Sequence, residues 1–179
     1  RFGLALGREM KAVGINMLYA PVLDVNTNPA NPIIGTRALS DIPELAGRMG
    51  KAVIDGIYKA GICPVGKHFP GHGDTDRDSH LELPYVNREV DSLEKVELEP
   101  FAQTISHGMK VIMTAHVIYS AWDDQLPATF SPFILKNILR EKLGFDGLII
   151  TDDLEMKAVE KHILFESIPR LGSIAGVDL

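Results

Sequence analysis

Residues 131–153 have the sequence SPFILKNILREKLGFDGLIITDD, which contains a helix, a glycine and a strand in succession. Ser131 and Pro132 are typical of a helix start, because a hydroxyl caps the first turn and proline fits the first helical position. Gly144 follows the amphipathic stretch, at a place where helix ends favour a left-handed residue. The apolar run 148–151 is continuous, as in a parallel strand that is buried on both faces. We therefore expect a helix over 131–143 followed by a buried strand.

The same unit recurs along the whole chain. Helices are expected at 2–13, 43–59, 88–106, 131–143 and 169–175, with Asn87 as the cap of the third, and strands at 15–19, 62–66, 111–114, 148–151 and 177–179. This alternation predicts an α/β fold with a parallel sheet. Two connections, 20–42 and 67–86, are longer than usual and each follows a strand. Ligands bind at the carboxyl ends of parallel strands, so both loops are candidates for function.

Composition describes an ordinary soluble globular domain. Of the 179 residues 45% are hydrophobic, and 18 Lys and Arg stand against 24 Asp and Glu, which gives a formal charge of −6. Lys and Arg form no dense run, and no apolar stretch reaches membrane-spanning length, so neither a nucleic acid nor a membrane is an expected partner. The single cysteine, Cys63, fits a reducing compartment, and a cytoplasmic location is expected.

The second long loop opens with the segment 67–80, KHFPGHGDTDRDSH. Its alternating aspartates imitate a calcium-binding loop, but Ser79 and Tyr85 stand where the turn glycine and the bidentate glutamate belong. His68 and His72 have the spacing of a helical zinc motif, yet a proline and a glycine between them disfavour a helix. A metal site is therefore disfavoured, and a solvated surface loop or an acid–base site remains.

The acid–base interpretation rests on Asp78 and His80. Two residues apart in a turn, the carboxylate can fix the tautomer of the imidazole and stabilise its charged form. A histidine held in this way can act as general acid and base near neutral pH. Lys67 and His68, at the end of the preceding strand, would then offer hydrogen bonds to a ligand's hydroxyl groups.

A second group of polar residues follows the strand 148–151. Asp153 is the better candidate for an N-cap, and Asp152 for a carboxylate directed at substrate. Retaining glycoside hydrolysis needs a nucleophilic carboxylate and a separate acid/base, roles that Asp152 and His80 could fill. In the first long loop, Arg37 offers a planar set of donors for a polar ligand, and Asp24 is expected to brace the loop. A third strand is followed by His116, for which either a place at the same site or a structural hydrogen bond is open.

These motifs resemble glycoside hydrolase family 3, in its bacterial β-N-acetylglucosaminidase (β-hexosaminidase) branch. The resemblance rests on KHFPGHG at 67–73, DSH at 78–80 and TDDLEM at 151–156. Further segments stand in the expected order: APVLDVN at 20–26, IGTR at 34–37, MTAH at 113–116 and LGFDG at 143–147.

The resemblance implies a (β/α)8 TIM-type barrel and retaining hydrolysis of terminal non-reducing β-linked N-acetylglucosamine. The expected substrates are muropeptides, in peptidoglycan recycling, or chitooligosaccharides. By the same resemblance Asp152 is the nucleophile and His80 the general acid/base, assisted by Asp78. Residues that would bind the sugar are Arg37, Lys67 and His68. No metal or organic cofactor is expected.

The barrel is expected to be incomplete. A full barrel needs eight strands and about 250 residues, whereas this sequence supplies about five strands, and the family's Asp-x-Glu-Gly-Gly segment is absent. Residues 1–179 are therefore expected to be the central part of one barrel domain, truncated at both ends. Other hypotheses stay open: a phosphorylase or a β-glucosidase of the same family, an inactive sugar-binding fragment, and a metal-dependent hydrolase.

Overall fold

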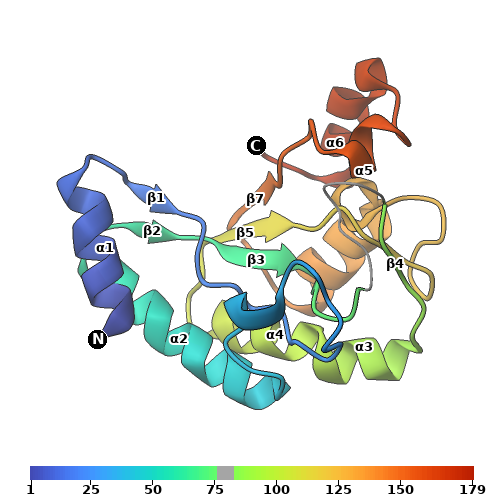
Figure 1. Cartoon of the computed structure of the whole chain (residues 1–179). Helices are drawn as coiled ribbons and strands as arrows, with labels where there is room; N and C mark the ends of the chain where they lie inside the picture. The colour runs from blue at the N-terminus through green and yellow to red at the C-terminus, as the bar shows by residue number, and fades with distance from the viewer. Residues whose placement is uncertain (76–82) are drawn as a thin grey trace.

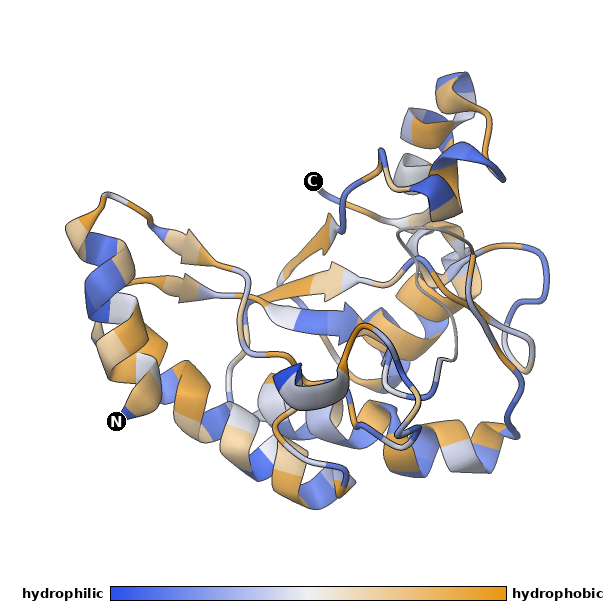
Figure 2. Ribbon diagram, in the orientation of Figure 1, coloured by the Kyte–Doolittle hydropathy of each residue, from blue (hydrophilic) through white to orange (hydrophobic). Residues whose placement is uncertain are grey.

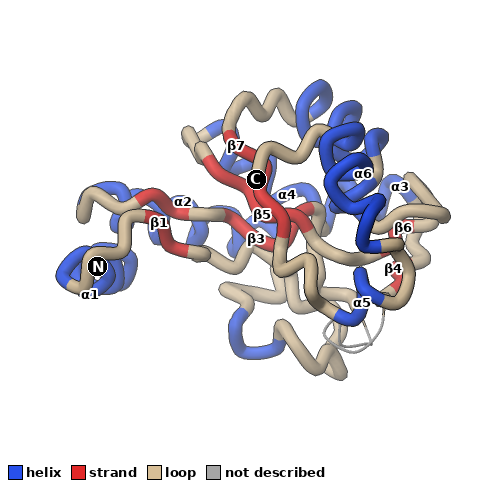
Figure 3. Tube along the Cα trace, turned by 90° about the horizontal axis from the view of Figure 1, so that it is seen from above, coloured by secondary structure: helices blue, strands red, loops and turns tan. Residues whose placement is uncertain are grey.

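A parallel three-stranded sheet forms the centre of the chain in the computed structural model, which describes residues 1–75 and 83–179. Its strands lie in the order β3 (Gly66–Phe69), β5 (Val111–Thr114) and β7 (Leu148–Thr151), side by side in Figures 1 and 3. β5 and β7 pair in register from Val111 opposite Leu148 to Thr114 opposite Thr151. The last residues of the chain continue this order, because the amide of Thr151 donates to the carbonyl of Leu179.

Two smaller parallel pairs extend this arrangement. β1 (Met17–Leu18) pairs with β2 (Cys63–Pro64), and β4 (Tyr85–Val86) pairs with β6 (Ile118–Tyr119). The predicted parallel pairing is thus confirmed for the named strands of the described chain. The strand expected at 62–66 continues as β3 to Phe69, so Lys67 and His68 lie within a strand rather than just after it.

Helices cover the outer side of the strands (Figure 1). They are α1 (Phe2–Ala12), α2 (Pro43–Lys59), α3 (Val90–Val96), α4 (Leu98–Ser106), the π-helical η3 (Phe133–Lys142), α5 (Lys157–Glu160) and α6 (Ile168–Ala175). Short 3-10 turns occur at η1 (Gly35–Arg37), η2 (Ala128–Phe130) and η4 (Phe165–Ser167). Among the described helices, none has both the length and the apolar character that crossing a membrane requires.

The helix expected over 88–106 is divided in two, and its predicted cap is wrong. α3 begins after Glu89 rather than Asn87, and α4 begins anew at Leu98. Pro100 explains the division, because a proline lacks the amide proton that a continuous helix needs and is tolerated only in a first turn. The helix expected over 131–143 is confirmed as η3. The Ser131 hydroxyl accepts the Ile134 amide at its start.

The core lies between the central sheet and the helices. Buried residues from both layers meet there: Phe69, Phe101, Ile112, Leu135 and Ile149. Figure 2 shows that β3 is hydrophilic while β5 beside it is largely apolar. The hydrophilic part is Lys67 and His68, so β3 carries polar side chains into the centre of the fold.

Glycines allow helices α1 and α2 to pack closely. A Cβ atom at Gly56 would lie 2.5 Å from the Leu4 nitrogen and 2.9 Å from the Gly3 Cα. Both neighbours are backbone atoms of α1, which can yield only by moving the whole helix. The contact therefore fixes the position of α1 against α2.

Gly56→Ala is expected to lower the free energy of unfolding by about 1–3 kcal/mol, as overpacking does. Gly172→Ala is the matched control, because a Cβ there would meet only the Val177 Cβ at 3.8 Å. Urea unfolding of both variants beside the unchanged protein measures the difference. Equal stability of the Gly56 and Gly172 variants would contradict the close packing.

Candidate active site

The carboxyl ends of β3 and β7 bring His68 and Asp152 together. His68 Nε2 lies 3.8 Å from Asp152 Oδ2, and the exposed fraction of the side chain is 6% for His68 and 31% for Asp152. A buried imidazole thus faces a carboxylate that solvent can reach. Two of the predicted site residues, from distant parts of the sequence, share one location.

Asp24 holds both the backbone amide and the ring of His68. Its side chain is completely buried, and Oδ1 accepts the amides of His68 (3.1 Å) and His72 (2.6 Å), while Oδ2 lies 2.7 Å from His68 Nδ1. Burial alone would raise the pKa of Asp24, but the charge and hydrogen bonds of His68, together with His72, lower it below its ordinary value. Because a carboxylate only accepts, Nδ1 carries the proton and Nε2 is the nitrogen that faces Asp152. A bracing role was expected for Asp24, but its direct hold on His68 was not predicted.

Lys67 places positive charge near the same carboxylate, and Arg37 lies near Lys67. Burial lowers the pKa of Lys67; the charge of Asp152 raises it and the charge of Arg37 lowers it further, so all three groups interact. Lys67 Nζ also lies 5.8 Å from the centre of the Tyr19 ring. Arg37, in η1, donates to the Ile33 carbonyl at 3.3 Å. These two side chains can offer charged donors to a polar ligand.

Two cavities lie beside these residues, and Tyr19 lines both of them. One, of about 370 Å³, is lined by Asp152 and the ends of β5 and β7. The other, of about 430 Å³, is lined by Arg37 and Lys67. The predicted carboxylate and the predicted sugar-binding cations thus line adjoining cavities.

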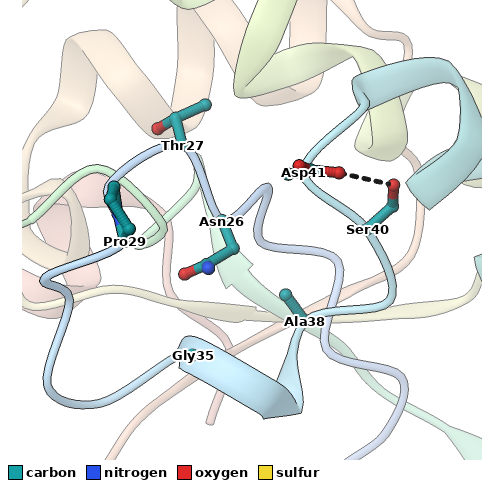
Figure 4. Close-up of a pocket in the computed structure, with 7 residues that line it drawn as sticks. All are labelled: Asn26, Thr27, Pro29, Gly35, Ala38, Ser40 and Asp41. Atoms are coloured by element: carbon teal, nitrogen blue, oxygen red, sulfur yellow. Dashed lines mark hydrogen bonds between the residues drawn. The ribbon is translucent and has the colours of Figure 1, made fainter.

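A larger hollow of about 560 Å³ lies elsewhere, within the first long loop (Figure 4). It is bounded by the segment from Asn26 to Pro29 and the segment from Gly35 to Asp41. Of the predicted catalytic and sugar-binding residues that the structure describes, none lines it. We therefore place the candidate site by its chemistry, at Asp152, rather than by cavity size.

Hydrogen bonds of His72 stabilise the turn that follows β3. Its Nδ1 lies 2.7 Å from the Thr75 hydroxyl, and Asn31 donates to the His72 carbonyl at 2.8 Å. Burial lowers the pKa of His72 to about 4 against the opposing charge of Asp24, so the ring is neutral at pH 7. Within residues 1–75 and 83–179, no group of three His, Cys, Asp or Glu side chains is placed to hold a metal ion.

Asp74 is held at the end of the described part of this loop. Arg88 donates to both its carboxylate oxygens, at 2.6 and 2.5 Å, and the Thr27 hydroxyl donates at 3.1 Å. Asp78 and His80 lie outside the described residues. Their role as an acid–base dyad stays a prediction.

Glu97 lies buried beneath the same loop, in contact with Gly71. Its exposed fraction is 1%, and neither carboxylate oxygen has a hydrogen-bond partner in the described part of the chain. Burial raises the pKa of Glu97 to about 7; the charge of Arg88 opposes this and that of Asp74 adds to it. Burial of Glu97 was not predicted, because a glutamate within an expected amphipathic helix is usually solvated.

His116 is held by structural hydrogen bonds, and Asp153 caps a turn. The His116 ring bonds to Thr129 and to the Asp153 carbonyl, which favours the structural alternative left open for it. The Asp153 side chain accepts the Glu155 amide at 2.9 Å, although the helix α5 begins only at Lys157. The capping role expected for Asp153 therefore applies to a turn rather than a helix.

Comparison with known proteins places the chain in a family. The sequence model described as "Glycosyl hydrolase family 3 N terminal domain" matches residues 1–179. The chain belongs to glycosyl hydrolase family 3. Its predicted α/β barrel fold is confirmed, and in the described part the parallel strands form an incomplete barrel.

Relatives of this family 3 chain carry names that agree with the predicted branch. It is 45% identical to the β-hexosaminidase of Methylococcus capsulatus, covering 86% of this chain and 46% of the relative, and 43% identical to that of Haemophilus influenzae, covering 99% and 50%. The chain thus spans about half the length of these curated relatives.

Solved structures of the family agree in the same way. The family 3 β-N-acetylglucosaminidase of Paenibacillus sp. str. FPU-7 superposes with a TM-score of 0.96 at 43% identity, over 99% of this chain and 34% of that one. NagZ of Neisseria gonorrhoeae, solved with N-trifluoroacetyl-D-glucosamine, gives 0.88 at 39% identity, over 99% and 50%.

Asp24→Asn is expected to lower the free energy of unfolding at pH 7 by about 3 kcal/mol, because it removes a buried charge that three donors require. The folded pKa of Asp24 is depressed, so its stabilisation is present above the ordinary pKa and is lost as the pH falls through the folded value. Urea unfolding at several pH values measures this. Asp41→Asn, exposed in the same loop, is the control, and an equal effect of both changes would refute the anchor.

Glu97→Gln is expected to flatten the pH dependence of stability. With a folded pKa of about 7, Glu97 keeps a proton that the unfolded chain releases near pH 4.5, so the free energy of unfolding falls as the pH rises between these values. At pH 8 the variant is expected to be more stable than the unchanged protein by roughly 2–3 kcal/mol, and at pH 4 equal to it. Thermal unfolding across this range tests it, with the exposed Glu9→Gln as a control that keeps the original slope.

Proposed function

We propose that the polypeptide carrying this chain is a retaining β-N-acetylglucosaminidase with Asp152 as its nucleophile. The observation that carries the proposal is the position of Asp152, a solvent-accessible carboxylate at the end of β7, facing His68 across 3.8 Å beside Lys67. The proposed substrates have a terminal non-reducing β-linked N-acetylglucosamine. The names of the relatives support this choice, as does the N-acetylglucosamine analogue bound to the NagZ of Neisseria gonorrhoeae.

The first step transfers the sugar to the enzyme. A carboxylate oxygen of Asp152 attacks the anomeric carbon while the bond from that carbon to the leaving oxygen breaks. The leaving oxygen keeps the electron pair and takes a proton from the His80 imidazolium, which Asp78 stabilises. In the second step water attacks the anomeric carbon, its proton passes to His80, and the bond to Asp152 breaks.

The surrounding residues bind and orient the sugar. Arg37 and Lys67 donate to sugar oxygens, and the fixed ring of His68 presents Nε2 beside the nucleophile. Because Asp24 holds His68 on both its amide and its ring, this contact is formed before substrate arrives. We further propose muropeptides as substrates, in peptidoglycan recycling. The cytoplasmic location stays a prediction.

Asp152→Asn is expected to reduce kcat/KM on an aryl β-N-acetylglucosaminide by at least about 10³-fold, because the amide is a poor nucleophile. The assay uses the full polypeptide that carries this sequence. Asp153→Asn is the matched control, since its amide oxygen still accepts the Glu155 amide. An Asp152 variant with more than a tenth of the original activity would refute the proposal.

The same assay distinguishes the phosphorylase. Product formation is compared in phosphate and in a phosphate-free buffer. Free N-acetylglucosamine at the same rate in both supports hydrolysis, and glycosyl phosphate as the main product in phosphate would contradict it.

A further inference from the structure

We propose that His116 is a positioning residue for Asp152, holding the backbone of Asp153, the residue that follows the nucleophile. The inference rests on the proposed function, because it assigns His116 a part in the reaction of Asp152. His116 follows β5, the strand beside β7, and its exposed fraction is only 1%. His116 acts through the backbone of Asp153 rather than by contact with the substrate.

The His116 ring is held on both nitrogens and on one face. Nε2 lies 3.0 Å from the carbonyl oxygen of Asp153, and Nδ1 lies 2.8 Å from the Thr129 hydroxyl. The ring stacks on Phe130, with an angle of 8° between the planes and 6.5 Å between the centres. These contacts come from two separate segments, η2 and the loop after β7, so the ring has a single position.

The donor and the acceptor can be assigned for each hydrogen bond of the His116 ring. A carbonyl oxygen only accepts, so Nε2 carries the proton and donates to Asp153. Burial lowers the pKa of His116, although the charge of Asp152 opposes this, so the ring is neutral and Nδ1 accepts from Thr129. The Thr129 hydroxyl has one proton, which the Ala115 carbonyl at 3.1 Å shares with His116. With that proton engaged, the Thr129 oxygen accepts from Thr114 at 2.8 Å. A chain of donors therefore runs from β5 through η2 to the loop after β7.

The backbone of Asp153 connects this series of hydrogen bonds to the nucleophile Asp152. Its amide donates to Asp152 Oδ1 at 2.9 Å, the one hydrogen bond to that carboxylate in the described part of the chain. The carbonyl of the same residue accepts from His116. Removing the His116 donor leaves the Asp153 carbonyl with the Met156 amide, at 3.2 Å, as its remaining partner and loosens the loop that orients Asp152. A displacement of about 1 Å at a reacting group costs roughly 10²-fold in rate.

The test measures formation of the glycosyl-enzyme in the full polypeptide. The probe is 5-fluoro-β-N-acetylglucosaminyl fluoride: Asp152 bonds to the anomeric carbon, and fluoride leaves with the electron pair. Intact mass gives the labelling rate, and an aryl β-N-acetylglucosaminide gives KM. His116→Phe keeps the stacking on Phe130 and loses both hydrogen bonds. It is expected to slow labelling by about 10- to 100-fold, with KM changed less than about threefold.

Further variants separate positioning from folding. His116→Gln restores an N–H donor at the Nε2 position and is expected to recover most of the labelling rate. Thr129→Val leaves the ring in place but removes its partner, and is expected to slow labelling in the same direction. His107→Phe, a partly exposed histidine paired with Asp55, is the control and is expected to label at the original rate. Thermal unfolding of each variant accompanies the rates.

Labelling of the His116→Phe variant at the original rate would overturn the inference and leave the proposed function standing. Equal losses in the Phe and Gln variants, with KM and the unfolding temperature changed together, would also overturn it, because they indicate a purely structural role. An unchanged protein that takes no label on Asp152 would instead refute the proposed function, and this inference with it.

Discussion

The candidate site depends on one buried carboxylate. Asp24 accepts two backbone amides and one ring N–H from β3 and the turn after it, while no part of its side chain reaches solvent. A buried charge is tolerated only where such donors satisfy it. The first long loop, β3 and the turn at His72 are thereby tied into one unit, and the position of His68 beside Asp152 follows from it.

The charges around Asp152 follow from differences in burial. His72 and His116 lie deep enough for burial to lower the pKa of each, so they act as neutral hydrogen-bonding groups. Positive charge near the nucleophile comes instead from Lys67, with Arg37 near it, and both side chains line one open hollow. The neutral histidine rings therefore hold the site in shape by hydrogen bonds, while the charge of the Asp152 carboxylate is compensated by side chains closer to solvent.

Local sequence rules predicted the elements that depend on local chemistry. The continuous apolar run of β7 and Gly144, with its φ of 66°, stand where the sequence placed a strand and a helix end. The same rules failed where the outcome depends on partners distant in the chain. β4 and β6 have only two residues each, too few for a local pattern, and each pairs with the other across more than thirty residues.

The site was predictable to the same extent. Asp152 was found because an acidic residue follows a buried apolar run, and Asp24 follows a similar run, in Ala20-Pro21-Val22-Leu23. The two carboxylates differ in burial: the Asp152 side chain lines a cavity, whereas the Asp24 side chain is buried against His68. No local pattern carries that information. Glu97 was missed for the same reason, since its burial depends on a loop that crosses its helix.

The turn after β3 packs against Glu97, the residue before α4, and this contact has an evolutionary consequence. Gly71, at a φ of 146°, lies so close to Glu97 that a Cβ atom would come within 2.8 Å of its Cγ, and the Tyr119 hydroxyl donates to the Gly71 carbonyl. A side chain at position 71 requires a smaller one at 97, whereas the Tyr119 hydroxyl bonds to a backbone carbonyl that any residue supplies. We therefore expect natural sequences to vary positions 71 and 97 jointly, so that homologues carry correlated substitutions at these two positions.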